Sequence, residues 1–246
     1  MSMKIGANAP CPCESGQKYK RCCKLKSQSS VGYSTATGDI YSQWGDCTDE
    51  ILKDEPKAEL IKSIFFSMIE AINGMNWRGA CHQVSATLYI LFKEIELNAE
   101  LCSGGVVVPN FGAFPHTWIE IDGKVYDATI WNQGAKEIQR APIIASRHID
   151  TAHETNLLYG VKGVPFDEGV HQTLTIPLVD LMRGEIPIDG GVTWDVLYNI
   201  ADKIGIKLDG RGGEFWNAEK LTQRYANVYA ALKQEIENPF LAHQRP

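Results

Sequence analysis

The sequence predicts an α+β protein in which helices pack on an antiparallel sheet, with a small metal-binding segment in front. Three observations support this prediction. Two apolar stretches with helical spacing lie between Leu60 and Ile95. Asp122-Gly123 separates two β-prone segments, which is typical of a two-residue hairpin turn. Four of the seven cysteines lie between positions 11 and 23.

Length and composition indicate a globular protein. At 246 residues with 44% apolar content, the chain has room for one large domain, or for a medium one with a small appendage. No run approaches the roughly 18 apolar residues of a membrane span, and residues 1–10 lack the apolar core of a signal peptide. An odd number of cysteines, mostly clustered, fits metal ligation in a reducing compartment. We therefore expect a cytoplasmic location.

Charge divides the chain into two parts. Residues 1–30 hold six basic side chains and one acidic side chain, a net charge of +5. The remainder holds 18 basic and 29 acidic side chains, a net charge of −11. We expect the two parts to meet different partners.

The cysteine cluster predicts a structural zinc site. Its four candidate ligands are Cys11, Cys13, Cys22 and Cys23. Four thiolates suit tetrahedral zinc and leave no open position for catalysis. A segment this short cannot fold on its own core, so zinc would supply its folding free energy. Zn²⁺ is the only cofactor that the sequence predicts.

The cluster resembles the SEC-C motif, the zinc-binding tail of the SecA translocation ATPase. The resemblance covers about Ile5 to Lys24 and includes the turn Ser15-Gly16 and the run Lys18-Tyr19-Lys20-Arg21. Glu14 departs from it, since glycine is expected there. The resemblance implies docking to ribosomes or partner proteins, and a zinc staple without a partner is the alternative. Five net charges with one aromatic fall short of a nucleic-acid footprint, so we expect no specific DNA binding.

Domain boundaries follow from composition. Residues 1–26 form the predicted zinc knuckle. Residues 27–45 are rich in Ser, Thr and Gly without periodicity and are interpreted as a linker. Residues 46–246 form the predicted enzyme domain.

Two helices are expected before the hairpin. The first follows Pro56, ends at Gly74 and carries the stripe Leu60, Ile61, Ile64, Phe65, Met68, Ile69 and Ile72. The second begins near Cys81 and carries Val84, Leu88, Leu91, Phe92 and Ile95. Cys81 then lies in a first turn, where free N–H groups and the helix dipole favour thiolate over thiol. The same N–H groups are candidates for holding an oxyanion.

Hairpin parity places a histidine beside an aspartate. A two-residue turn at Asp122-Gly123 pairs Ile121 with Lys124, and hence Trp118 with Asp127. The side chains of His116, Trp118, Val125 and Asp127 then share one face. His116 and Asp127 become diagonal neighbours about 7 to 8 Å apart at the backbone, within reach of a side-chain hydrogen bond. A thiol, an imidazole and an orienting carboxylate are the parts of a catalytic triad.

Three segments in this order resemble the transglutaminase-like superfamily within the papain-like fold. They are Gly79-Ala80-Cys81, His116-Thr117-Trp118-Ile119-Glu120 and Tyr126-Asp127-Ala128-Thr129, and the resemblance covers about residues 57–131. It implies Cys81 as nucleophile, His116 as general base and later acid, Asp127 as orienting group and Trp118 beside the histidine. The second oxyanion donor of the family has no clear match. Asn76 and Trp77 are candidates by proximity in sequence alone.

The expected function is that of a bacterial cysteine-dependent hydrolase, a peptidase or amidase that acts on peptide or protein side-chain amides through an acyl-enzyme. An acyl transferase is the first alternative, because the triad serves that reaction too. Arg78-Gly79-Ala80-Cys81 is similar to arylamine acetyltransferases as well as to transglutaminases. A non-catalytic adaptor is the alternative from another class.

Other features are weaker. We expect His82 to point away around the helix as a structural residue or pocket wall, and Cys47 and Cys102 to be incidental thiols. His148 and His153 form a weak metal pattern, interpreted as surface. Gly210 to Gly213 lacks the Lys-Ser/Thr ending of a phosphate loop.

Two regions after Trp131 have expected secondary structure. Strand-like patches occur at 174–176 and 186–188. A final helix is predicted from about Glu214 to Ile236.

Overall fold

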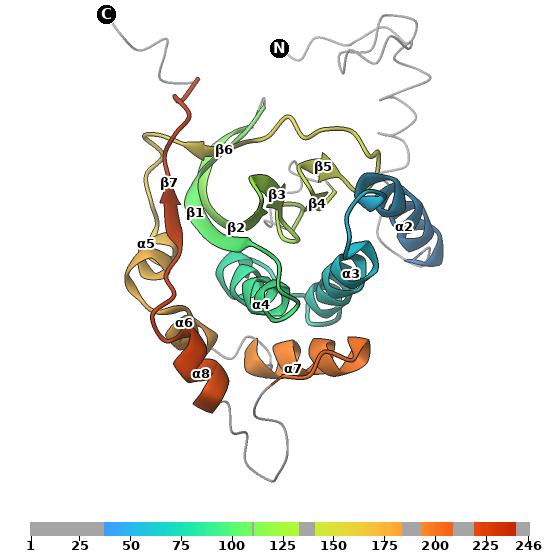
Figure 1. Cartoon of the computed structure of the whole chain (residues 1–246). Coiled ribbons are helices and arrows are strands. Elements are labelled where there is room, and N and C mark those ends of the chain that lie inside the picture. Colours follow the sequence, from blue (N-terminus) through green and yellow to red (C-terminus); the bar gives the residue numbers. More distant parts are fainter. Residues whose placement is uncertain (1–36, 110, 133–140, 184–192, 209–218, 240–246) are drawn as a thin grey trace, which may run out of the picture. The chain divides into compact units, whose positions relative to one another are not determined.

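A computed structural model describes residues 37–109, 111–132, 141–183, 193–208 and 219–239 (Figure 1). The chain separates into two compact units, 1–42 and 43–246. The four candidate zinc ligands lie outside the described residues. The second unit combines helices with a mainly antiparallel sheet, so it is an α+β unit as predicted. No helix in the described ranges has the length and apolarity needed to cross a bilayer.

One five-stranded sheet organises the second unit. Its strands are β1 (Ala99–Val108), β2 (Gly112–Ile121), β3 (Lys124–Tyr126), β6 (Leu158–Val161) and β7 (Ala231–Lys233). β1 pairs along its whole length with β2 in antiparallel register. Two strands share the other edge of β1: β6 pairs antiparallel at Gly105–Val107, and β7 pairs parallel at Cys102–Gly104.

The hairpin between β2 and β3 has the predicted register. Ile121 pairs with Lys124, Glu120 with Val125 and Ile119 with Tyr126. Asp122 and Gly123 adopt φ values of 49° and 76°, and two successive positive φ values are the signature of a type I′ turn. The prediction from Asp-Gly is therefore confirmed.

The two helices before the sheet are also confirmed. They are α3 (Ala58–Gly74) and α4 (Cys81–Glu94), and their predicted apolar stripes are buried except for Leu60, which is 37% exposed. α4 packs on β2 and β1, while α6 (Leu178–Arg183) and α7 (Thr193–Ile204) pack on α4 (Figure 1). This packing fixes the first turn of α4 beside the sheet.

The opposite face of the sheet carries a second core. Even-numbered side chains of β1 and β2, among them Val106 and Trp118, point into it. The segment after β3 closes this core through a two-stranded sheet of β4 (Ile143–Ile144) and β5 (Arg147–His148). The cluster consists of Cys102, Val106, Val108, Trp118, Val125, Ile130, Ile143 and Leu157, with Phe114 and Tyr159 against it.

The stretch interpreted as a linker is partly helical. α2 (Thr37–Leu52) begins inside residues 27–45. Its buried positions Trp44, Thr48 and Leu52 are four residues apart, so they line one side of the helix. The stripe is sparse, and Thr48 does not count as apolar, which explains why periodicity did not reveal it.

The strand-like interpretation of 174–176 is wrong. Residues Glu168–Thr175 form α5, which begins where the Asp167 side chain accepts a hydrogen bond from Val170 N. A carboxylate cap of this kind stabilises the helix start and outweighs the β propensity of a short apolar run. The patch at 186–188 lies outside the described residues.

The predicted final helix is shorter than expected. α8 (Glu219–Tyr225) ends well before Ile236, and the chain then extends into β7. Tertiary hydrogen bonds divert it: Leu178 N donates to Val228 O at 2.7 Å, and Ala230 N donates to Thr173 O at 3.0 Å. Such contacts are invisible to local periodicity.

Candidate functional site

Cys81 is the first residue of α4 and is 7% exposed. The tight loop before it contains Asn76 and Gly79 in the left-handed region, at φ 48° and 66°. The loop is anchored by the buried Trp77, whose carbonyl accepts a hydrogen bond from Asn132 Nδ2 at 3.0 Å. The loop therefore fixes the position of Cys81 at the start of the helix.

The start of α4 has no side-chain cap. Ala80 occupies the N-cap position and provides no side-chain hydrogen bond. The N–H groups of the first turn lack intrahelical acceptors, and the positive end of the helix dipole lies there. The thiol is thus next to donors that favour a negative charge.

α4 begins against the outer edge of β2. The pairing of β2 with β3 runs from Ile119 to Ile121, so it stops short of His116 and Thr117. Ser85, one turn after Cys81, donates from Oγ to the backbone O of Thr117 at 3.0 Å. This edge is where the nucleophile candidate meets the strand.

His116 and Asp127 form a buried hydrogen-bonded pair. The distance from His116 Nε2 to Asp127 Oδ2 is 2.7 Å, and both side chains are fully buried. Asp127 follows β3 and forms an antiparallel bridge with Ile143 of β4, which ties the end of β3 to the small β4–β5 sheet. The structure thus brings these two predicted site residues together on the face that parity indicated.

The Asp127 carboxylate accepts five hydrogen bonds. Oδ1 accepts from Thr129 N at 2.9 Å, Thr129 Oγ1 at 3.0 Å and Ile130 N at 3.1 Å. Oδ2 accepts from His116 and from Tyr159 Oη at 2.9 Å. Asp127 followed by Ala128 and Thr129 after a strand is typical of an Asx turn. This pattern could have predicted the three hydrogen bonds to Oδ1. Nothing in the sequence pointed to Tyr159.

The electrostatics favour a thiolate–imidazolium pair. Burial raises the pKa of Cys81, but hydrogen bonds and charges from His116 and His82 outweigh it and lower the pKa from 9.0 to about 6. Burial lowers the pKa of His116, but the charge and hydrogen bond of Asp127, with a contribution from Cys81, raise it to about 10. Burial also raises the pKa of Asp127, and His116 more than offsets this, so the carboxylate stays ionised.

The ring of His82 is turned toward β2, in contrast to the expectation that it points away around the helix, and it contributes to the lowered pKa of Cys81. The physical reason lies in β2: Thr117 Oγ1 lies 2.8 Å from His82 Nδ1 and holds the ring toward the sheet. Adjacency to the cysteine was its only sequence signal.

The three weaker candidates have other partners. The Trp118 indole is fully buried, donates to Glu120 Oε1 at 3.0 Å and packs edge-on against Tyr159. Asn76 accepts from Arg78 Nε at 3.4 Å, and Trp77 is buried in the loop. None of these contacts involves Cys81, so the second oxyanion donor remains unassigned among them.

The other described thiols lie in different environments. Cys102 is fully buried in β1, and its pKa is raised by burial and by Glu120 and Glu100. Cys47 in α2 is half-buried. His153 is exposed and His148 half-buried, which agrees with the surface interpretation of that pair.

Within the described part of the chain, Glu100, Cys102 and Glu120 are the only group with the spacing of metal ligands. Lys233 Nζ lies 2.7 Å from Glu100 and 3.2 Å from Glu120, so a lysine cation already neutralises these carboxylates. The arrangement is an ion-pair cluster. For zinc, the fitting donor set is the four-cysteine group near the start of the chain.

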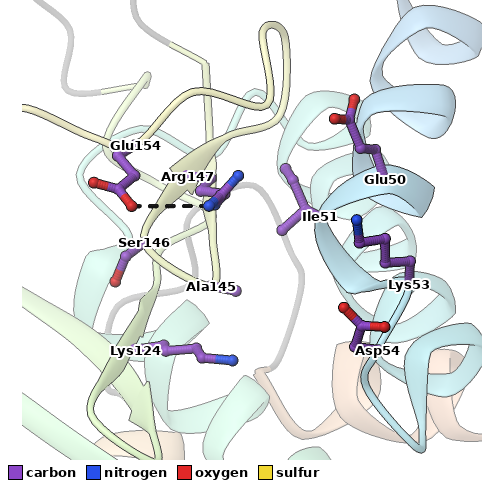
Figure 2. Close-up of a pocket in the computed structure, with 9 residues that line it drawn as sticks. All are labelled: Glu50, Ile51, Lys53, Asp54, Lys124, Ala145, Ser146, Arg147 and Glu154. Atoms are coloured by element: carbon purple, nitrogen blue, oxygen red, sulfur yellow. Dashed lines mark ion pairs between the residues drawn. The ribbon is translucent and has the colours of Figure 1, made fainter.

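A charged hollow of about 360 Å³ lies between α2 and β5, as Figure 2 shows. Three acidic and three basic side chains line it, and two of the bases, Lys124 and Arg147, are ion-paired with Glu55 and Glu154. Neither Cys81 nor His116 contributes to its lining. It is therefore separate from the thiol site.

Comparisons with known proteins concern the region before the described residues. Residues 8–24 match the SEC-C motif, a zinc-binding type of motif that contains all four clustered cysteines. The protein translocase subunit SecA of Desulforudis audaxviator (strain MP104C) is 55% identical over 29 residues, which are 12% of this chain and 3% of the SecA chain. No solved structure matches the chain. The chain thus carries a SEC-C motif ahead of its α+β unit.

Proposed function

We propose that residues 43–246 form a cysteine-dependent hydrolase of the transglutaminase-like type, which cleaves amide bonds in peptides or protein side chains. The observation that carries the proposal is the buried hydrogen bond between His116 and Asp127, together with a Cys81 thiol at an uncapped helix start whose pKa His116 lowers. A low pKa at a buried cysteine beside a histidine is characteristic of catalytic thiols.

In the proposed first step, the Cys81 thiolate attacks the carbonyl carbon of the amide. The sulfur–carbon bond forms while the carbonyl π pair moves to oxygen. Free N–H groups in the first turn of α4 donate to that oxyanion. Asp127 keeps the His116 ring oriented, because four other donors hold its carboxylate in place: Thr129 N, Thr129 Oγ1 and Ile130 N at Oδ1, and Tyr159 Oη at Oδ2.

In the second step, the tetrahedral intermediate collapses and the carbon–nitrogen bond breaks. His116 donates its proton to the departing amine, which leaves a thioester on Cys81. Since Nε2 faces Asp127, Nδ1 is the nitrogen that makes this transfer. Water then attacks the thioester, His116 takes up the water proton, and the acid product leaves as the thiolate returns.

A labelling experiment tests the activated thiol. Near neutral pH, we expect iodoacetamide to modify Cys81 faster than Cys47, although Cys47 is more exposed, and to leave Cys102 unmodified. Peptide mapping by mass spectrometry gives the order. Equal or slower modification of Cys81 would remove the main support for the proposal.

A turnover experiment tests the reaction class. Peptide mixtures incubated with the full chain, with Cys81→Ala as control, are analysed for new carboxylates and for amine-linked products. New carboxylates support hydrolysis, and isopeptide or acylated amine products support acyl transfer from the same thioester. A chain that binds peptides equally well with and without Cys81, and yields neither product, is an adaptor.

We further propose that the SEC-C segment binds structural zinc and docks the enzyme to a protein or ribosomal surface. Its net charge of +5 over residues 1–30 contrasts with the acidic remainder, which favours an acidic docking surface. Metal analysis of the full chain is expected to give zinc, and Cys11→Ser is expected to lose both zinc and sedimentation with ribosomes. An unchanged zinc content in that variant would contradict the site.

A further inference from the structure

β2 extends well beyond its partner β3. Their pairing covers Ile119–Ile121, whereas β2 already begins at Gly112. In the described part of the chain, no strand pairs with the outer edge of β2 between Gly112 and Trp118. On its other side, β2 stays paired with β1 over the same residues. The sheet therefore presents a half-strand of unpaired backbone at this edge.

Hydrogen bonds around the hairpin show which residues of β2 face the outer edge. Val125 directs its backbone away from β2: its N–H donates to Ser146 Oγ at 2.9 Å, and its C=O accepts from Ser146 N at 2.8 Å. The backbone of its partner Glu120 therefore bonds to β1, because antiparallel pairs alternate between the two edges. The register of β1 and β2 is continuous, so the odd-numbered residues of β2 face outward along the whole strand.

Two further observations agree with this parity. The backbone O of Thr117 faces outward, since it accepts from Ser85 Oγ at 3.0 Å. Pro115 also occupies an outward position, where its missing N–H leaves the hydrogen bonds to β1 intact. The N–H and C=O of Ala113 and the C=O of Pro115 then point outward, and none of them has a partner among the described residues.

Access to the outer edge changes along the strand. Ala113 is exposed, whereas Thr117 is fully buried. The buried end lies at the start of α4, because Thr117 accepts from Ser85, one turn after Cys81. The four residues from Ala113 to Thr117 span about 14 Å of strand. The edge thus leads from solvent to the nucleophile candidate.

We propose that the outer edge of β2, residues 113–117, binds the leaving-group side of an extended peptide substrate as an added antiparallel strand. The peptide would donate N–H groups to Ala113 O and Pro115 O and accept a hydrogen bond from Ala113 N. This inference rests on the proposed function and deepens it. It makes main-chain peptide bonds the substrate class, in preference to side-chain amides.

The direction of the peptide follows from the proposed proton transfer. His116 gives its proton to the departing amine, so that nitrogen lies beside His116. The departing chain continues from this nitrogen toward its own carboxyl end, and the free edge continues from His116 toward Ala113. Because β2 runs from Ala113 to His116, the added strand is antiparallel to it. Both other partners of β2 pair with it in the same way.

Pairing of this kind distinguishes leaving groups by their length. A single residue beside His116 does not reach Ala113, whereas about five residues span the whole edge. Each main-chain hydrogen bond makes a modest net contribution, because the peptide gives up bonds to water. The full set is therefore expected to change rates by roughly tenfold or more.

Aminolysis of the acyl-enzyme tests the proposal. p-Nitrophenyl acetate is used to acetylate Cys81 with release of p-nitrophenolate, and the amine of an added peptide then attacks the thioester carbonyl. The carbon–nitrogen bond forms, the carbon–sulfur bond breaks and His116 takes the amine proton, which reverses the leaving-group step. At equal concentration, we expect pentaalanine amide to capture the acetyl group roughly tenfold or more faster than alanine amide. Mass spectrometry measures both acetylated products, and Cys81→Ala gives the background.

Two variants of the full chain locate the binding edge. Ala113→Pro removes the outward N–H but leaves the pairing with β1, and a proline blocks strand addition. We expect it to lower the preference for pentaalanine amide at least about threefold. Ala113→Ser keeps the N–H and is expected to keep the preference. Circular dichroism compares the folding of the two variants.

N-methylated peptides repeat the test on the wild-type chain, so the result does not depend on how a variant folds. Successive residues of an added strand face the edge and the solvent alternately. N-methylation at successive positions of pentaalanine amide is therefore expected to reduce capture at every second position and to leave it unchanged between them.

The outcomes separate the two proposals. No release of p-nitrophenolate above the Cys81→Ala background would overturn the proposed function, and this inference with it. Acetylation of Cys81 followed by equal capture by pentaalanine amide and alanine amide would overturn only the binding edge. A preference that responds neither to Ala113→Pro nor to the position of the N-methyl group would also overturn it, because the peptide would then bind elsewhere.

Discussion

Two buried cysteines in the same unit have opposite chemistry. Cys81 and Cys102 are 7% and 0% exposed, and burial raises the pKa of both. Imidazoles surround the first thiol and bring its pKa to about 6, whereas Glu100 and Glu120 lie near the second and raise its pKa further. Burial alone therefore gives an inert thiol, and the sign of the neighbouring charges decides whether a buried cysteine is reactive.

Removing His116 is expected to reduce the difference in reactivity between Cys81 and Cys102 more than any other change considered. In His116→Gln, Cys81 loses the histidine that lowers its pKa most. The proposed reaction also loses the proton donor for the leaving amine. Amide hydrolysis should fall by about 10³-fold or more. Steady-state turnover of a peptide found with the wild-type chain measures this. Residual turnover within tenfold of wild type would show that His116 is not the acid and base.

Stability against pH should sharpen the contrast next. The pKa of His116 is raised from 6.5 to about 10 on folding, so its contribution is complete below 6.5 and is lost as pH rises to about 10. The pKa of Cys81 is lowered from 9.0 to about 6, so its contribution is complete above 9.0 and is lost as pH falls to about 6. Between these limits the two slopes oppose each other.

Cys81→Ala removes one of these slopes. We expect its free energy of unfolding, relative to wild type, to fall with rising pH above about 6.5, by up to roughly 1.4 kcal/mol per pH unit. Urea unfolding of both chains at several pH values checks the difference. A constant difference across this range would mean that Cys81 and His116 do not exchange a proton. Cys102→Ala, as a matched control, should show no pH-dependent difference below about pH 9, since Cys102 is protonated there in both the folded and the unfolded chain.

Tyr159→Phe should have a smaller effect. It deletes one of five hydrogen bonds to Asp127 and leaves the ring in place against Trp118. We expect turnover to fall by a few-fold and the free energy of unfolding by about 1 to 2 kcal/mol, typical of one hydrogen bond to a charged group. Turnover and urea midpoints measure both. An increase in either would contradict the supporting role of Tyr159.

Glu120→Gln should change reactivity least. It removes one negative charge near Cys102 and so moves the pKa of that thiol toward its ordinary value. Because Cys102 is fully buried, we still expect no iodoacetamide modification at neutral pH in the folded chain. Rapid modification of Cys102 in this variant would show that charge, rather than access, protects it.

The local parts of the fold were predictable, and the long-range parts were not. The Asp122-Gly123 turn and the stripes of α3 and α4 depend on neighbouring residues, so pattern alone placed them. β7 depends on its pairing with β1, more than a hundred residues earlier, whereas local sequence predicts a helix in that region. The start of α2 was hidden because its buried side includes Thr48.

The candidate site shows the same division. Parity along one hairpin was sufficient to place His116 beside Asp127. His82 required the knowledge that Thr117 lies across from the first turn of α4, and Tyr159 required the fold of a distant strand. Both are tertiary contacts that residue type and spacing do not encode.

The edge of β1 that β6 and β7 share also determines when the sheet is completed during synthesis. β1 is made early, but its partner at Cys102–Gly104 is Ala231–Lys233, one of the last described segments to leave the ribosome. Until then, Ser103 and its neighbours lack a partner on that edge, and Ser103 Oγ lies 2.8 Å from Thr117 Oγ1, which in turn contacts His82. The SEC-C motif therefore leaves the ribosome long before the strand that completes this edge, so under the proposed function docking can precede the chemistry.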